Sequence, residues 1–167
     1  MADHVDLVLE QWRVRRPDLD PSPMGIIGRM SRLGALFDAE LRRNFSKHDL
    51  DRASFDVLAT LRRSNAEHSL TPAGLMHSSM VTSGAISQRL DRLEARGLVT
   101  RAPSETDRRG VLVTLTPEGL ELIDKVLPTH VDTESQLLAG LSAAEREQLA
   151  GLLRTLLESL GDKRDQS

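Results

Sequence analysis

Two short β-rich runs on either side of a charged, turn-rich tip most constrain the fold of this chain. The runs are residues 98–101 and 110–115, and apolar and polar residues alternate in both. Such runs, joined by a segment of turn-forming residues, predict an antiparallel hairpin with a long tip. Gly97, a residue type that commonly ends a helix, comes immediately before the first run. The pattern therefore predicts a helix that leads directly into a β-hairpin.

A pair of short helices is predicted just before this hairpin. Thr71 followed by Pro72 is the favoured order at a helix start, and it indicates a helix over residues 71–78. After a tight turn, Thr82 or Ser83 is placed to cap the second helix. The apolar stripe on the inner side of that second helix consists of Ile86, Leu90 and Leu93.

Longer apolar helices are predicted on both sides of this module. With three Phe, one Trp and no Tyr, the core must be built from aliphatic residues and Met, which suits helix-on-helix packing. The predicted fold class is therefore mainly α with a small β-hairpin. By their caps and apolar spacing, the other expected helices cover residues 3–13, 24–45, 51–63, 116–139 with a kink at Pro128, and 142–160.

The composition argues against several classes of function. The chain has no Cys, which removes disulfides, thiolate metal sites and Cys nucleophiles. Its five His are not spaced for metal binding, and no nucleophile grouping or glycine-rich phosphate loop indicates catalysis. We therefore expect no enzyme activity and no cofactor, with the histidines in solvent or at interfaces. Since no long apolar run or export signal occurs, we expect a cytoplasmic protein without a membrane partner.

Basic charge is concentrated near the middle of the chain. The formal net charge is −3, yet residues 87–110 hold six Arg against four acids, whereas residues 116–167 hold ten acids against five bases. Three of these arginines, Arg101, Arg108 and Arg109, gather around the hairpin tip. A local basic surface on an acidic chain indicates a defined contact with nucleic acid.

The second helix of the pair directs short polar side chains outward. At about 100° per residue, Ser87, Gln88 and Asp91 point away from the apolar stripe. In a DNA major groove such side chains reach base edges, while Arg92 and Arg96 on the flank of the helix are placed to meet phosphates. Arg89 lies nearest the buried side and is expected to face inward. The alternative interpretation is an ordinary amphipathic helix with solvated charges.

The order of the elements favours the DNA-binding interpretation. Two short helices followed by a hairpin with a basic tip are the arrangement of a winged helix-turn-helix. One helix of that module fits the major groove, and the hairpin, or wing, follows the backbone or enters the minor groove. Stacking on single strands is disfavoured, because residues 82–110 contain no aromatic side chain.

The chain resembles the MarR family of bacterial transcriptional regulators over nearly its whole length. The resemblance is carried by "RLEARGLVTR", by Asp107 to Arg109 in the wing, and by "VTLTPEG". It implies a homodimer that binds double-stranded DNA at a palindromic operator, with repression as the family default. It also implies one domain over residues 1–167, composed of dimerisation helices over 1–46 and 116–161 and a winged helix-turn-helix DNA-binding region over 47–115.

The resemblance also assigns roles to residues of the DNA-binding region. By family analogy, Arg109 enters the minor groove and Asp107 holds its guanidinium in place. The two reading helices of the dimer are expected to lie about one DNA turn apart. The expected DNA-contacting residues are Thr82, Ser83, Ser87, Gln88, Arg92, Asp107, Arg108 and Arg109.

An additional N-terminal helix resembles the branch of this family that responds to urate or related anionic metabolites. Arginines offer paired donors to an anion such as urate or an aconitate-like acid, and an indole packs against a flat ligand. Plain packing of the first helix is the alternative role for Trp12, and a salt bridge or a surface carboxylate is the alternative for Asp56. The residues at the matching ligand positions are Trp12, Asp56, Arg89 and Arg101.

Two classes of function stay open at this point. The first is a ligand-responsive, DNA-binding transcriptional regulator. The second is a winged-helix module that binds another protein and senses no ligand. The charge of the wing and the polar outer face of the second helix favour nucleic acid over protein.

Overall fold

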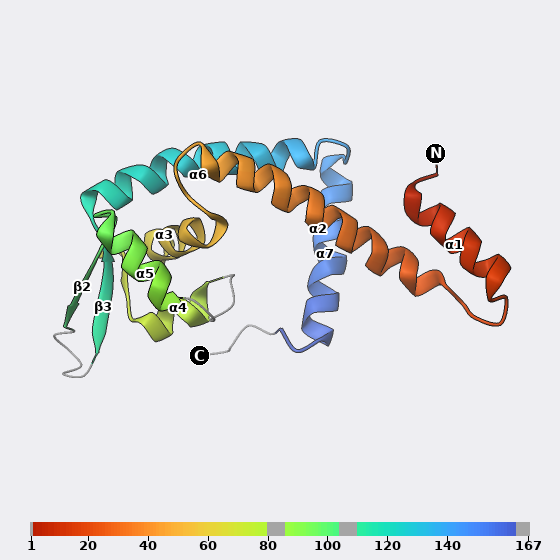
Figure 1. Ribbon diagram of the computed structural model, residues 1–167, viewed down its shortest axis with the longest axis horizontal. Helices are drawn as coiled ribbons and strands as arrows, with labels where there is room; N and C mark the ends of the chain where they lie inside the picture. Colours follow the sequence, from red (N-terminus) through yellow and green to blue (C-terminus); the bar gives the residue numbers. More distant parts are fainter. Residues whose placement is uncertain (1, 80–85, 104–109, 163–167) are drawn as a thin grey trace. The chain divides into compact units, whose positions relative to one another are not determined.

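The computed structural model describes residues 2–79, 86–103 and 110–162. The chain divides into two compact units, Met1–His130 and Val131–Ser167, and one helix, α6, contributes to both. The predicted fold class, mainly α with a small sheet, is confirmed. In chain order the elements are α1 (His4–Arg15), α2 (Ser22–Ser46), α3 (Arg52–Ser64), β1 (Ser69–Leu70), α4 (Pro72–Ser78), α5 (Ile86–Ala95), β2 (Val99–Pro103), β3 (Val111–Leu115), α6 (Pro117–Leu137) and α7 (Ala143–Ser159) (Figure 1).

Helices α1, α3, α4 and α7 begin where the sequence places capping residues, whereas α2 begins after Pro21 with no side-chain cap. Asp3, Asp51 and Thr71 each accept a hydrogen bond from a backbone N–H in the first turn of the helix that follows. Gly97 has a φ of 69°, the left-handed conformation expected of a glycine just after a helix. The boundaries of α1, α3 and α4, and the end of α5, therefore lie close to their predicted positions, whereas the predicted caps of α5, Thr82 or Ser83, lie outside the described residues. The helix with Pro128 is continuous from Pro117 and ends two residues earlier than predicted.

Three antiparallel strands form a sheet in the order β1-β3-β2. Strands β2 and β3 are the predicted hairpin, with Val99 opposite Leu115. Strand β1 was not predicted, because two residues carry too little alternation to be recognised in a sequence. Its Ser69 lies opposite Thr114, and the two hydroxyls hydrogen-bond. The base of the hairpin is thus attached to the segment that leads into α4.

Aliphatic side chains form the core of the first unit, as the composition predicted. Phe45 and Phe55, which join α2 to α3, stack with ring centroids 4.5 Å apart, and His130 of α6 packs at 4.5 Å from Phe55. His130 therefore packs against an aromatic cluster while it stays partly exposed, and its predicted place in solvent or at an interface remains a prediction. Other deeply buried side chains are Leu58, Leu61, Leu75, Leu90, Leu93, Val99, Val113, Ile123 and Val126.

The start of α6 is packed tightly against the turn between α5 and β2. The Thr116 hydroxyl donates to the Gly97 carbonyl at 2.6 Å and accepts from the Gly119 N–H at 3.0 Å. The Thr116 N–H donates to the Leu98 carbonyl at 3.1 Å. A Cβ at position 119 would lie 2.0 Å from that Leu98 carbonyl oxygen. Only glycine fits there, and this explains the spacing of Thr and Gly in "LTPEG".

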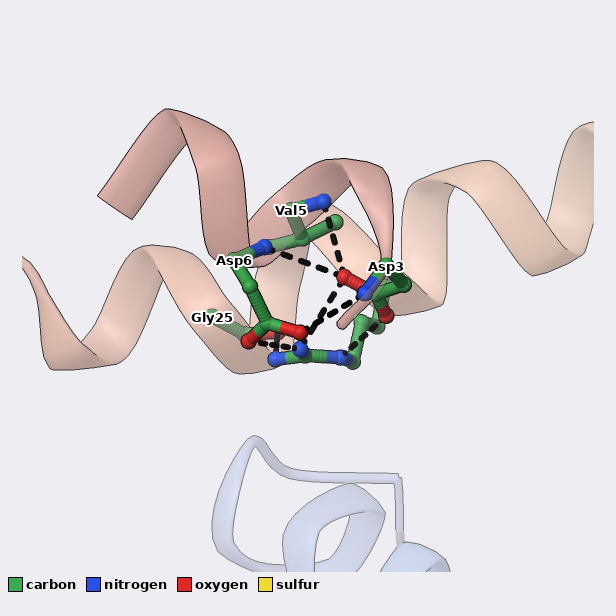
Figure 2. Close-up of polar contacts among 5 residues, drawn as sticks. Asp3, Val5, Asp6 and Gly25 are labelled. Atoms are coloured by element: carbon green, nitrogen blue, oxygen red, sulfur yellow. Dashed lines mark hydrogen bonds and ion pairs between the residues drawn. The ribbon is translucent and has the colours of Figure 1, made fainter. Parts of the chain in front are cut away.

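Helix α1 is held against α2 by two small residues and one arginine. A Cβ on Gly25 would lie 3.2 Å from Leu9, and one on Gly28 would lie 3.5 Å from Val5, so the two helices approach closely at these glycines. The Arg29 guanidinium spans the helices. It donates to both Asp3 carboxylate oxygens at 2.8 and 3.1 Å, to Asp6 at 2.6 Å and to the Gly25 carbonyl at 3.1 Å (Figure 2).

This cluster of charges is sensitive to acid. The Asp6 backbone N–H and the Arg29 guanidinium lower the pKa of the Asp3 carboxyl, and the corresponding groups of Asp3 and Arg29 lower the pKa of Asp6. A lowered pKa means that the ionised form is favoured in the folded state. The ion pairs therefore stabilise the docked helix above the ordinary pKa range of Asp and are lost as the pH falls through the lowered values.

The second unit consists of the end of α6 and helix α7. Ser142 and Glu145 form the predicted capping box at the start of α7. None of the residues of α7 is buried, and several of its leucines are exposed. Within the described ranges, no helix is both long enough and apolar enough to cross a bilayer.

The close approach at Gly119 leads to a stability prediction. We expect Gly119→Ala to lower the free energy of unfolding by about 1–3 kcal/mol, because the new methyl group meets backbone that cannot rotate away. Denaturant unfolding at a fixed protein concentration measures the change. Gly140→Ala is the matched control, since a Cβ at Gly140 meets nothing within 4 Å. Equal stability of the two variants would contradict the packing described for α6.

The charge cluster at Arg29 leads to a second prediction. We expect Arg29→Ala to speed amide hydrogen exchange in residues 4–15 by about two- to fivefold, the range for exposed ion pairs. In the unchanged protein, exchange in α1 should rise only below about pH 4, after correction for intrinsic rates. Arg16→Ala is the control, because Arg16 pairs with Asp18 inside the connector. If both variants exchange alike, Arg29 does not hold α1.

Candidate nucleic-acid interface

Helix α5 packs one side against the core and leaves the other side exposed. Leu90 and Leu93 are buried, and the predicted inner stripe is therefore present. Ser87, Gln88 and Arg92, three of the residues predicted to contact DNA, are exposed. The exposed side thus combines short hydrogen-bonding side chains with a guanidinium, a combination that suits base edges and phosphates.

The second half of α5 is anchored to the loop between α2 and α3. The Arg96 guanidinium donates to the backbone carbonyl of Asp49 at 2.5 Å. Asp49 has a φ of 53°, a conformation that a non-glycine residue rarely adopts. Arg96 was predicted to meet phosphates, and the structure shows a contact within the protein that holds the helix in place, which the sequence alone did not indicate.

Arg89 faces inward, as predicted, and approaches the start of α3. Its side chain is 23% exposed, and its Nε lies 3.7 Å from Asp51 Oδ1. Burial acts to raise the pKa of Asp51, but hydrogen bonds from Ser54 and the charge of Arg89 outweigh it and hold that pKa below its ordinary value. Arg89 therefore couples α5 to the N-terminus of α3.

Arg101 of β2 joins the base of the hairpin to α5. Its Nε donates to Glu94 at 2.9 Å, its Nη2 lies 2.5 Å from Glu94 and 2.6 Å from Asp91, and its backbone N–H donates to Glu94 at 3.1 Å. The hydrogen bond from Arg101 lowers the pKa of Glu94. The sequence pattern indicated Arg101 as a site residue but not its contact with Glu94. Contact between a helix and a later strand depends on the turn that joins them.

A surface hollow of about 380 Å³ lies beside Arg101. It is bounded by the start of α4, by α5 and by both strands of the hairpin. Arg101 and Ser87 supply polar groups in a mostly apolar lining. The lining residues are Pro72, Ser87, Leu90, Arg101, Ala102, Pro103 and Val111.

The four residues predicted to bind a ligand lie on four different elements. Trp12 is 41% exposed on α1, which packs against α2. Asp56 is buried in α3, so its alternative role as a surface carboxylate is wrong. Arg89 approaches Asp51 just before α3, and Arg101 pairs with Asp91 and Glu94 of α5. The ion pairs of these two arginines thus do not involve Asp56.

Part of the predicted DNA-contacting set falls outside the described residues. These residues are Thr82, Ser83, Asp107, Arg108 and Arg109, which were predicted at the start of the second helix of the pair and at the tip of the wing. Elsewhere, across residues 2–79, 86–103 and 110–162, no group of three or more acidic or His side chains is arranged to hold a metal ion.

Comparison with known proteins places this arrangement among transcriptional regulators. Residues 48–110, which include α3 to α5 and β2, match the MarR family. The chain is 41% identical over 166 residues to the HTH-type transcriptional regulator PecS of Dickeya dadantii, and the match covers 98% of this chain and all of PecS.

Solved structures agree with the sequence comparison. A mutant MarR from Escherichia coli, complexed with operator DNA, superimposes with a TM-score of 0.70 at 29% identity, over 93% of this chain and 99% of that one. BpsR of Bordetella bronchiseptica, whose DNA binding is regulated by 6-hydroxynicotinic acid, has a TM-score of 0.70 at 27% identity, over 77% and 90% of the two chains.

Proposed function

The chain belongs to the MarR family of DNA-binding transcriptional regulators, and on this basis we propose that it is a repressor that a small anionic metabolite releases from a palindromic operator. The observation that carries the proposal is the joint geometry of α5 and the hairpin. The exposed side of α5 is polar, and Arg101 fixes the base of the hairpin beside it. One helix and one hairpin are thereby available to the same DNA duplex.

Contacts to DNA are assigned to the two parts of this module. In the major groove, Ser87 and Gln88 reach base edges, and Arg92 contacts a phosphate. Thr82 and Ser83 contact DNA from the start of the reading helix. By family resemblance, Arg108 and Arg109 of the wing contact the backbone and the minor groove, and Asp107 orients Arg109.

The functional unit proposed here is a homodimer. Helix α2 exposes Met24, Ile26, Ile27, Met30, Leu33 and Leu36, and helix α7 exposes Leu149, Leu152, Leu153, Leu156 and Leu157, followed by Leu160 at its C-cap. Groups of exposed apolar side chains along one helix mark surfaces that bind another protein. A two-fold pairing of subunits matches a palindromic operator, with half-sites about 34–36 Å apart.

The ligand proposed for this protein is a flat anion such as urate or an aconitate-like acid. The hollow beside Arg101 supports this, because it offers an apolar lining with a guanidinium at one side. An anion bound there competes with Asp91 and Glu94 for Arg101. Trp12, Asp56 and Arg89 are proposed to take part in binding the ligand or in transmitting its effect. The regulation of BpsR by an aromatic acid is a parallel in a protein of the same fold.

A second candidate function is a winged-helix module that binds protein and senses no ligand. The exposed apolar residues of α2 and α7 are compatible with it. The polar outer side of α5 favours DNA. Binding of the purified protein to duplexes from beside its own coding region separates the two functions.

The DNA-binding assignment is tested at the wing. We expect Arg109→Ala to weaken binding to the operator duplex strongly and to lower the slope of log affinity against log salt by about one. Fluorescence anisotropy over a series of salt concentrations measures both quantities. Arg62→Ala is the control, because it also removes one arginine but at a position that is not assigned to DNA contact. Arg62 of α3 pairs with Asp124 of α6 at 2.7 Å. Unchanged affinity and slope in Arg109→Ala would refute the role of the wing.

The ligand assignment is tested with urate and trans-aconitate. We expect one of the two to raise the melting temperature of the protein and to lower its affinity for the operator. Trp12→Phe and Arg101→Ala should weaken both responses, because they remove a flat packing surface and a guanidinium. Thermal-shift assays and gel retardation measure the responses. If neither compound acts in either assay, this class of ligand is ruled out.

A further inference from the structure

The C-terminal end of α2 finishes in a turn that presents one backbone carbonyl to the end of α5. The Leu50 N–H donates to the Phe45 carbonyl at 3.1 Å, and the Asp49 N–H donates to the Ser46 carbonyl at 3.3 Å. These are the two hydrogen bonds of a Schellman motif, in which the residue at the position of Asp49 is left-handed and is usually glycine. Asp49 has the expected φ of 53°. The end of α2 therefore sets the direction of the Asp49 carbonyl.

Arg96 uses this carbonyl as its acceptor. It follows Ala95, the last residue of α5, and its Nη1 donates to the Asp49 oxygen at 2.5 Å. The acceptor is a neutral backbone group, so the bond fixes a position without cancelling the charge of the guanidinium. The end of α5 is thus tied to the end of α2 by one side chain.

A second arginine of α5 approaches the same short segment, residues 49–51. Arg89 precedes Arg96 by seven residues, and this spacing places both on one side of the helix, about 10 Å apart along its axis. The Arg89 Nε lies 3.7 Å from Oδ1 of Asp51, the N-cap residue of α3. Between the two arginines, Leu93 is buried in the core. The direction of α5 is therefore held at two points.

The distance between these points makes the direction sensitive to either contact. A shift of about 2 Å at one of them turns the helix axis by about 10°. Side chains that bind specifically need to be held to within about 10–20° of their productive geometry. Loss of one tie is therefore large enough to displace Ser87 and Gln88 from base edges. Phosphate contacts give general affinity for DNA and do not depend on the base sequence.

We infer that Arg96 is a positioning residue, whose bond to the Asp49 carbonyl sets the angle at which α5 meets the DNA duplex. This inference rests on the proposed reading of DNA by α5. It differs from the role predicted for Arg96 from the sequence, which is contact with phosphate. The two roles have opposite consequences for specificity and for salt dependence, because only a phosphate contact releases counterions.

Arg96→Ala distinguishes the two roles. We expect affinity for the operator duplex to fall about tenfold, as for the loss of one base contact. Affinity for an unrelated duplex of equal length, and the slope of log affinity against log salt, should stay unchanged. Fluorescence anisotropy with both duplexes over a series of salt concentrations measures these quantities. Equal losses on the two duplexes, with a slope lower by about one, would refute the positioning role.

Arg43→Ala is the matched control for charge. Arg43 also lies near the end of α2, but it pairs with Glu40 of the same helix and ties no two elements together. We expect its affinity for both duplexes to be unchanged. A loss of operator affinity equal to that in Arg96→Ala would overturn the inference, because it would show that the removed charge alone is responsible.

Two substitutions of Asp49 test the same bond from its acceptor. Asp49→Gly and Asp49→Val both remove the carboxylate, but only glycine adopts a φ of 53° freely, whereas valine is strained there. We expect Asp49→Gly to keep its operator affinity and Asp49→Val to bind the operator about tenfold more weakly, at an unchanged salt slope. In the Arg96→Ala background the two should bind alike, because the bond is already lost. Equal binding without Arg96→Ala, or a full difference with it, would contradict the inference.

Circular dichroism and melting temperature establish that each variant is folded. Asp49 and Arg96 are exposed, so we expect the substitutions to leave the fold intact. If Asp49→Val does not fold, the salt series of Arg96→Ala decides; if Arg96→Ala does not fold, the comparison of Asp49→Gly with Asp49→Val decides. Should the unchanged protein bind neither duplex, the proposed function is wrong and the inference falls with it. The contrary outcomes given for the variants overturn the positioning role alone and leave DNA binding in place.

Discussion

The close contact between the start of α6 and the turn after α5 is the constraint on which the rest of the DNA-binding unit depends. At this contact Gly119 lies against the Leu98 carbonyl, and Thr116 bridges the Gly97 carbonyl and the first turn of α6. The end of α5, the first strand of the hairpin and the start of α6 thereby meet within a few residues. One side chain, that of Thr116, and the close approach of Gly119 to the Leu98 backbone thus tie the hairpin to the end of α5.

The position of the hairpin beside α5 explains why Arg101 contacts α5 and also lines the hollow. From β2 its guanidinium reaches Asp91 and Glu94 on α5, and it also borders the hollow between the hairpin and α4. The helix that is proposed to read DNA and the proposed ligand site therefore both contact this one side chain. In the proposed function, coupling between the ligand and DNA requires a difference in free energy between the bound states, and a side chain that contacts both sites is a direct source of such a difference.

The sequence predicted the positions of the helices more completely than it predicted which residues contact one another. Caps such as Asp3 and Thr71 are local signals, since a side chain bonds to a backbone group three residues away, and the corresponding helix starts were correct. Strand β1 exists only because Ser69 and Leu70 pair with β3, and a sequence window does not contain that pairing. For the same reason Arg101 was recognised as a basic residue near the wing, but its bonds to Glu94 were not foreseen. The wing tip and the first residues of the reading helix lie outside the described residues, so their roles remain predictions.

Helix α1 carries the single Trp of the chain and packs on α2 across Gly25 and Gly28. The intrinsic fluorescence of this protein is therefore emitted almost entirely by α1. A quenching titration consequently reports the surroundings of this one helix. The occupancy of DNA on α5 has to be followed by a label or by the nucleic acid itself.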